Sequence, residues 1–228
     1  MISNTFKRIV GFSSIGSALL FVVSIVGMQF YISGNLEDVS SFIQNMLNNN
    51  GMMLLYGWPG LTATMLMIPL FYYVHKINEK NKSLSKSFLI MSLIGVVFVL
   101  IAYLFHLAFT YFHAPIYQQL GPNEQLAFNG VFKSMVGIQD MFWLGGDIFA
   151  FLGIAFLAIL SLKERILPKW MIIWVAIAGI SAAVGSFNFL PVYKPNPVLE
   201  AMFMGGFLLF TLWEIMIGIL LIRNKIGS

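Results

Sequence analysis

The stretch that decides the fold is QDMFWLGGDIFAFLGIAFLAILSLKER, Gln139–Arg165, an apolar run that ends in three charged residues. It is long enough for one membrane crossing, because about 20 apolar residues span a hydrocarbon core of about 30 Å. Asp140 lies at its start and Asp147 lies inside it. A carboxyl group at bilayer depth is costly and usually faces the protein interior, so Asp147 is the first candidate for a functional residue.

The composition is that of a membrane protein. Of the 228 residues, 59% are hydrophobic and 10% are charged, whereas a soluble domain has about 45–50% apolar and about 25% charged residues. There is no cysteine, which excludes disulfides, thiolate metal ligands and a cysteine nucleophile. No basic stripe with interleaved aromatic residues indicates a nucleic-acid surface. We expect the lipid bilayer as the main partner, a small molecule or an ion as a possible ligand, and no nucleic acid.

Six segments are long and apolar enough to cross a bilayer as helices. These expected spans are Ile9–Ile32, Met52–Val74, Phe88–Phe109, Phe142–Leu162, Trp170–Leu190 and Leu199–Ile222. The first exceeds the about 7–15 apolar residues of a signal peptide, so we expect it to remain as a span. The sequence predicts an all-α polytopic membrane protein, a six-transmembrane-helix bundle that residues 1–228 form as a single domain.

The basic residues predict the orientation of the bundle. Of the 13 basic residues, 11 flank the spans on one side, and only Lys133 and Lys194 lie on the other. The positive-inside rule then places the N and C termini in the cytoplasm. The even number of spans agrees with this orientation.

Two of the outer connections have features of their own. Ser33–Gly51 is expected to be a loop or a short surface helix. Thr110–Met141 is longer and has a helical composition, so we expect it to lie on the outer interface or to extend the fourth span outward.

Helix breakers interrupt the second span. The sequence GWPG, residues 57–60, lies within it, and Pro69 follows further along. Proline frees backbone carbonyl groups in a membrane helix. One interpretation is a kink that only serves packing; the other is a helix break at Trp58 and Pro59 that lines a site, as in many transporters.

Ionisable residues on three spans form a candidate polar site. A rise of about 1.5 Å per residue places His106 and Asp147 about 10–12 Å below the outer surface and Glu214 about 13 Å from the cytoplasmic end. Within a core of about 30 Å these depths are comparable. We hypothesise that these three residues, with Asp140, form one site inside the bundle.

The outer mouth of this site is expected at the top of the same helices. Asp140 precedes Asp147 by seven residues, which places both on one helix face about 10 Å apart. Gln139, His113 and Glu200 are the further candidates for the mouth.

Several chemistries could use these groups. A histidine and two carboxylates, here His106, Asp147 and Glu214, can hold a divalent metal that activates water, although no HExxH-like spacing supports it. The same groups can relay protons. In the simplest alternative, Asp147 is a structural acid that is hydrogen-bonded to His106, a tyrosine or a tryptophan. Walker and dinucleotide motifs are missing, so no cofactor is predicted beyond this optional metal.

A resemblance to a known family rests on five features of the second half. They are Gln139-Asp140 leading through Gly145 and Gly153, then Leu167-Pro168-Lys169-Trp170, Ala178-Gly179, Leu212-Trp213-Glu214, and Gly218. With them the chain resembles a bacterial membrane family catalogued as domain of unknown function four-three-eight-six. The resemblance implies a six-span protein of about this length in the bacterial cytoplasmic membrane, and it carries over no catalytic residues.

Three functions are compatible with these observations. The first is transport or permeation of protons or a small solute, with Asp147, Glu214 and His106 as coupling groups. The second is an intramembrane metal-dependent hydrolase that acts on lipid, and the third is a non-catalytic membrane partner or sensor. We rank them in this order. The sequence leaves open the ligand, the oligomeric state and whether the protein is an enzyme.

Overall fold

The computed structural model describes residues 2–32, 39–78, 81–164, 166–189 and 196–226. Nearly all of these residues are helical, and none lies in a strand. The α-helices are α1 (Asn4–Ile32), α2 (Val39–Asn48), α3 (Asn50–Leu66), α4 (Ile68–Lys76), α5 (Lys82–Ala108), α6 (Ala114–Tyr117), α7 (Pro122–Leu160), α8 (Lys169–Gly185) and α9 (Pro197–Ile222). A π-helical turn, Phe109–His113, joins α5 to α6.

Six helical segments are long and apolar enough to cross a membrane. They are Asn4–Met28, Asn50–Lys76, Lys82–Tyr117, Pro122–Lys163, Lys169–Asn188 and Pro197–Ile222. The prediction of an all-α bundle with six membrane-spanning helices is therefore confirmed. The chain has the architecture of a multi-pass membrane protein.

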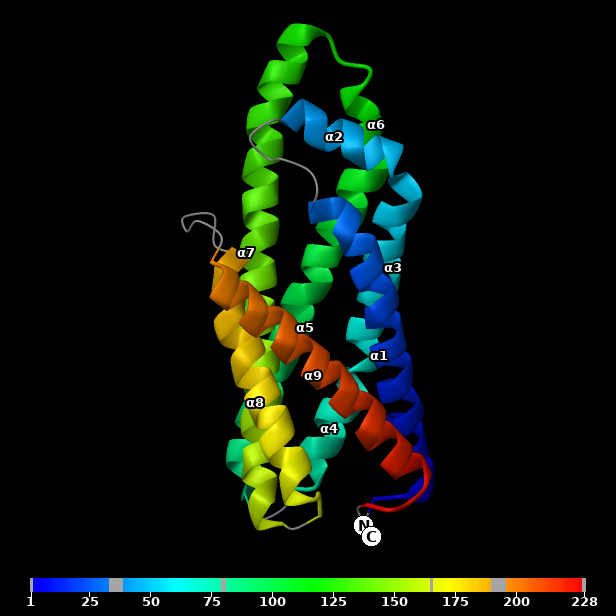
Figure 1. The fold of residues 1–228 in the computed structure, drawn as a ribbon, viewed down its shortest axis with the longest axis vertical. Coiled ribbons are helices and arrows are strands. Elements are labelled where there is room, and N and C mark those ends of the chain that lie inside the picture. Colours follow the sequence, from blue (N-terminus) through cyan, green and yellow to red (C-terminus); the bar gives the residue numbers. More distant parts are fainter. Residues whose placement is uncertain (1, 33–38, 79–80, 165, 190–195, 227–228) are drawn as a thin grey trace.

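The spans form a closed ring. Each packs against two neighbours, in the order α1, α3, α5, α7, α8, α9 and back to α1. Figure 1 shows α9 crossing the face of the bundle diagonally, from α8 at one end to α1 at the other. We call the end where α1 begins and α9 ends the base, and the end that carries α2 the top. Of the basic residues that the structure describes, only Lys133 lies away from the base.

Backbone contacts close the ring near the base. A Cβ atom added to Gly11 of α1 would lie 2.7 Å from the carbonyl oxygen of Gly218 on α9, and the reverse substitution gives the same distance. Small residues let membrane helices approach to this separation. The first and last spans are therefore in direct contact.

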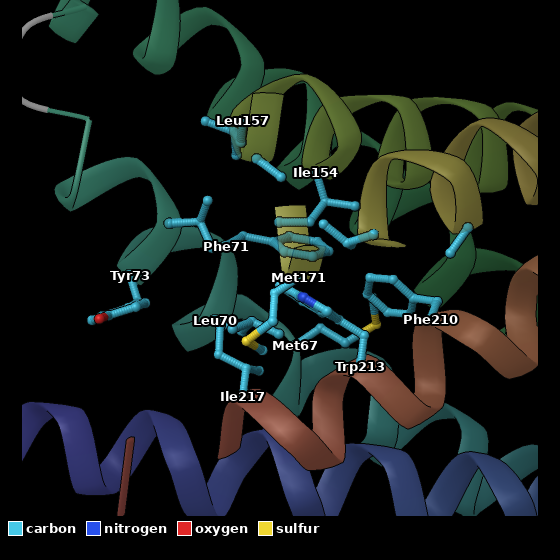
Figure 2. Close-up of a cluster of buried hydrophobic side chains, with 14 of the residues drawn as sticks. Met67, Leu70, Phe71, Tyr73, Ile154, Leu157, Met171, Phe210, Trp213 and Ile217 are labelled. Carbon is cyan, nitrogen blue, oxygen red and sulfur yellow. The ribbon is translucent and has the colours of Figure 1, made fainter. Parts of the chain in front are cut away.

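The base half of the bundle is a dense apolar core. Figure 2 shows its central side chains, among them Phe71 of α4, Ile154 of α7, Met171 of α8 and Trp213 of α9. All four are fully buried. Side chains from four spans thus fill the interior on this side of the ring.

At the top, α7 projects beyond the other spans (Figure 1). Its 39 residues correspond to about 58 Å at 1.5 Å per residue, nearly twice the thickness of a hydrocarbon core of about 30 Å. Of the two expectations for residues 110–141, the outward extension of the fourth span holds from Pro122 onward, whereas residues 110–117 continue the third span beyond α5.

A short helix packs beside this projection. The expected helix in Ser33–Gly51 is α2, and residues 33–38 lie outside the described residues. Four of its side chains are buried in a second apolar cluster with Phe109 and Phe132: Val39, Phe42, Ile43 and Met46. One face of α2 is therefore covered, so it is not simply a surface helix.

The expected helix break at Trp58 and Pro59 is wrong. Helix α3 continues through Pro59, and the interruption lies at Met67, between α3 and α4. There the amide of Met67 donates to the carbonyl oxygen of Thr64, three residues back, at 3.3 Å. Pro69 follows in the first turn of α4 and has no amide hydrogen to donate to Met65. The second proline, not the first, therefore coincides with the joint.

Candidate functional site

A cavity of about 160 Å³ lies above the apolar core, enclosed by α1, α3, α5, α7 and α9. Its wall is mainly aliphatic and aromatic, with side chains such as Phe21, Val99 and Phe207. The only ionisable acids on the wall are Asp140 and Asp147, and no lysine, arginine or histidine of the described chain lines it. The cavity is therefore apolar with an uncompensated acidic side.

The two carboxyl groups come from one face of α7. Asp140 and Asp147 are seven residues apart, which places them about 10 Å apart along the helix axis. Asp147 is 8% exposed. The Ser186 hydroxyl donates to its Oδ2 over 3.5 Å, a long hydrogen bond, and its Oδ1 has no hydrogen-bond partner among the described residues. Asp147 thus meets the cavity with one oxygen unpaired.

Three aromatic rings stand beside the acids. Trp143 lies between Asp140 and Asp147 on the same face of α7 and packs edge-on against Tyr103 of α5, with ring centroids 4.5 Å apart. Tyr56 of α3 stacks on Trp143 at 6.2 Å and lies 5.5 Å from Tyr103. The rings form a continuous aromatic wall from three helices.

Ser24 of α1 holds this wall in place. Its hydroxyl donates to the carbonyl oxygen of Tyr56 over 2.7 Å and lies 3.5 Å from the hydroxyl of Tyr103. Sequence reasoning missed Ser24, Tyr56, Tyr103 and Trp143. Only the spacing of Trp143, three residues after one acid and four before the other, could have indicated a site residue.

The joint between α3 and α4 also contributes to the wall. Met67, at the joint, lines the cavity together with Thr64, whose hydroxyl donates to the carbonyl oxygen of Gly60 over 2.8 Å. A broken membrane helix beside a site is a recurrent feature of transporters. Met67 keeps a right-handed helical backbone, with φ −72° and ψ −25°, so the second span bends at this joint without unwinding.

One side of the cavity approaches the outside of the bundle. Ile25 and Met28 of α1 line it and are half-buried, and Met204 of α9 lines it with 36% exposure. These residues follow Gly11 on α1 and precede Gly218 on α9, the two glycines at which the helices are in contact. Of the described wall, this part is the least covered by protein.

His106 stands behind the wall and does not line the cavity. It is fully buried, its Nε2 lies 2.9 Å from the carbonyl oxygen of Met53, and its ring packs edge-on against Tyr56 at 4.6 Å. Because a carbonyl oxygen only accepts, Nε2 carries the proton of this hydrogen bond. The position of His106 is that of a support for Tyr56.

Glu214 lies outside the cavity as well. It follows Phe207, the last cavity residue of α9, by seven residues, or about 10 Å along the axis. It is fully buried, and neither carboxyl oxygen has a hydrogen-bond partner within the described ranges. Its polar neighbour is Ser17 of α1, whose hydroxyl is also unpaired there.

The predicted metal set therefore does not form. The described part of the chain contains no group of three or more His, Asp or Glu residues that could hold a metal ion. The aromatic wall separates His106 from Asp147, and Glu214 lies two helical turns nearer the base. Equal depth on three helices did not imply proximity.

The predicted outer mouth is also dispersed. Gln139 is buried and its amide donates to the carbonyl oxygen of Ala102 over 3.2 Å, joining α7 to α5. The His113 ring packs against Phe109 and Phe128 in the second apolar cluster, beside α2. Glu200 is exposed in the first turn of α9. Of the proposed mouth, only Asp140 lines the cavity.

Comparison with known proteins gave one match. Neither the curated proteins nor the solved structures yielded a similar chain. The model of one family, described as Domain of unknown function (DUF4386), covers residues 14–225, which include every residue that lines the cavity. The chain therefore belongs to the DUF4386 family.

Proposed function

We propose that this protein transports a small solute, or lets it permeate, through the cytoplasmic membrane, with the solute bound in the cavity beside Asp140 and Asp147. The observation that supports this proposal is the cavity itself, a partly open space within a membrane bundle with two acids and no base on its described wall. An acid buried in a membrane bundle typically marks an ion or solute pathway. Following the positive-inside rule, the base faces the cytoplasm.

The state of Asp147 supports this proposal over a purely structural role. A structural acid is normally held by several hydrogen bonds or a close cation. The described partners of Asp147 supply one hydrogen bond of 3.5 Å. The free Oδ1 and the adjacent cavity leave room for a ligand to complete its interactions.

The lipid-hydrolase alternative has less support. It used His106, Asp147 and Glu214 as ligands of one metal, and the described residues contain no group of three or more His, Asp or Glu that could hold a metal ion. The joint at Met67 places a bend of the second span on the cavity wall.

Charge displacement on a solid-supported membrane tests the proposal. Proteoliposomes with the purified protein are exposed to concentration jumps of organic cations, amino acids, sugars and protons, and the transient current is recorded. We expect a saturable current for at least one class. Asp147→Asn should abolish this current, and Glu200→Gln, at an exposed position outside the cavity, should keep it.

Two results would count against transport. One is a wild-type protein that gives no current and no solute uptake with any class. The other is a current that Asp147→Asn leaves unchanged. A folded Asp147→Asn protein that differs from wild type in stability alone would favour the sensor or partner role.

A further inference from the structure

The wall chemistry of the cavity defines the class of solute more closely. We infer that the cavity binds a small organic cation, an ammonium group on an apolar body about the size of one aromatic ring. This inference rests on the proposed function for the solute's passage across the membrane, but the binding step can be tested alone.

The charges on the wall favour a cation. Asp140 and Asp147 are its only ionisable acids, and no basic side chain of the described chain faces them. An anion would meet two acids without a counter-charge, and a neutral solute would leave the charge of an ionised Asp147 uncompensated in an apolar space. A cation satisfies both requirements.

The aromatic wall favours an organic ammonium group. Such a group binds over the faces of tryptophan and tyrosine rings within about 6 Å of the centroid. Trp143 lies on α7 between the two acids, and Tyr56 and Tyr103 flank it at centroid distances of 6.2 and 4.5 Å. A single ammonium group next to Asp147 can therefore contact a carboxyl oxygen and an aromatic ring together.

The shape of the acidic side disfavours a bare metal ion. Calcium and magnesium require six or more oxygen ligands at about 2.0–2.6 Å. The two carboxyl groups are about 10 Å apart along the axis of α7, so one ion cannot be bound by both without a rearrangement. The remaining wall offers mostly carbon.

The volume limits the body of the ligand. The cavity measures about 160 Å³, close to the cavity of about 150 Å³ that accepts benzene in an engineered protein. Phe203 and Phe207 of α9 and Phe21 of α1 supply apolar surface for such a body. A ring or short alkyl group with one ammonium matches both the size and the polarity.

Equilibrium dialysis of phenyltrimethylammonium against the full chain in nanodiscs tests the inference. Its neutral isostere tert-butylbenzene has the same shape without the charge, and empty nanodiscs correct for partition into lipid. We expect saturable binding of one cation per chain, at least tenfold tighter than binding of the isostere. Asp147→Asn should weaken cation binding at least tenfold, and Glu200→Gln should leave it unchanged.

A second variant guards against misfolding. If Asp147→Asn does not elute as a monodisperse protein, Asp140→Asn takes its place, since Asp140 is only half-buried and lines the same wall. Equal binding of cation and isostere, or tight cation binding in the folded variants, overturns the inference.

The binding and current measurements distinguish a failure of the organic-cation assignment from a failure of the transport proposal. No cation binding, together with a solid-supported-membrane current for another solute class, overturns the organic-cation assignment and leaves transport standing. Saturable cation binding without any current or uptake supports the assignment and overturns transport.

Discussion

The indole ring of Trp143 on α7 meets the phenol ring of Tyr103 on α5 edge-on, with 4.5 Å between the ring centroids. This contact joins α7, which carries both cavity acids, to α5. The hydroxyl of Tyr103 on α5 lies in turn beside that of Ser24 on α1. The acids are thus held against an aromatic surface and not against lipid.

The first prediction concerns Trp143. Replacement by alanine should weaken phenyltrimethylammonium binding about tenfold, because a desolvated cation–π contact contributes up to about 2 kcal/mol. Trp143→Phe should retain part of the affinity, since it keeps a ring at the same place. The measurement is the dissociation constant in nanodiscs, and an alanine variant that binds as tightly as wild type would show that the ring plays no part.

The second prediction uses the absence of cysteine from the chain. A single cysteine introduced by Ser24→Cys faces the acidic cavity, so a cationic methanethiosulfonate should modify it faster than an anionic one of similar size. Leu126→Cys, at a position that is 75% exposed on the top of α7, is the matched control with similar rates for both reagents. Faster modification of Ser24→Cys by the anionic reagent would contradict an acidic cavity.

The third prediction concerns the contact between α5 and α7. A Cβ atom on Gly95 would collide with the backbone of Ala150 and Gly146. Gly95→Ala should therefore lower the free energy of unfolding by about 1–3 kcal/mol, the usual cost of overpacking. Gly137→Ala on α7 meets nothing within 4 Å and should raise stability by up to about 1 kcal/mol. Denaturation followed by tryptophan fluorescence measures both, and similar effects at the two positions would refute the contact.

The fourth prediction separates Glu214 from the cavity. Neither of its carboxyl oxygens has a hydrogen-bond partner among the described residues, and the hydroxyl of Ser17 is the polar group beside them. An unsatisfied buried polar group costs about 1–3 kcal/mol. Glu214→Met should raise the unfolding free energy by a similar amount and leave cation affinity unchanged. If affinity falls together with that of Asp147→Asn, Glu214 belongs to the binding site after all.

Hydrophobic patterning was sufficient for the fold and insufficient for the site. The spans are predictable because backbone groups in lipid must be satisfied within each helix, so length and apolarity decide them. The run at Gln139–Arg165 also indicated Asp147 correctly as a buried residue. None of this depends on which helices are neighbours.

The predictions that were wrong all concerned which side chains of different helices lie next to each other. His106 and Asp147 were placed together by depth, but Tyr56 and its ring partners stand between them. Of two prolines in one span, only tertiary packing decides which accompanies a break, and it is Pro69 near Met67. The aromatic wall draws on three helices, so no local pattern could have assembled it.

The contact between α1 and α9 has a consequence for biogenesis. Because α9 supplies Phe203, Met204 and Phe207 to the cavity wall, the cavity is incomplete until α9 has been synthesised and inserted. Until then the cavity lacks the wall that α9 contributes. A nascent chain that stalls before residue 197 carries both cavity acids without a closed site for a ligand.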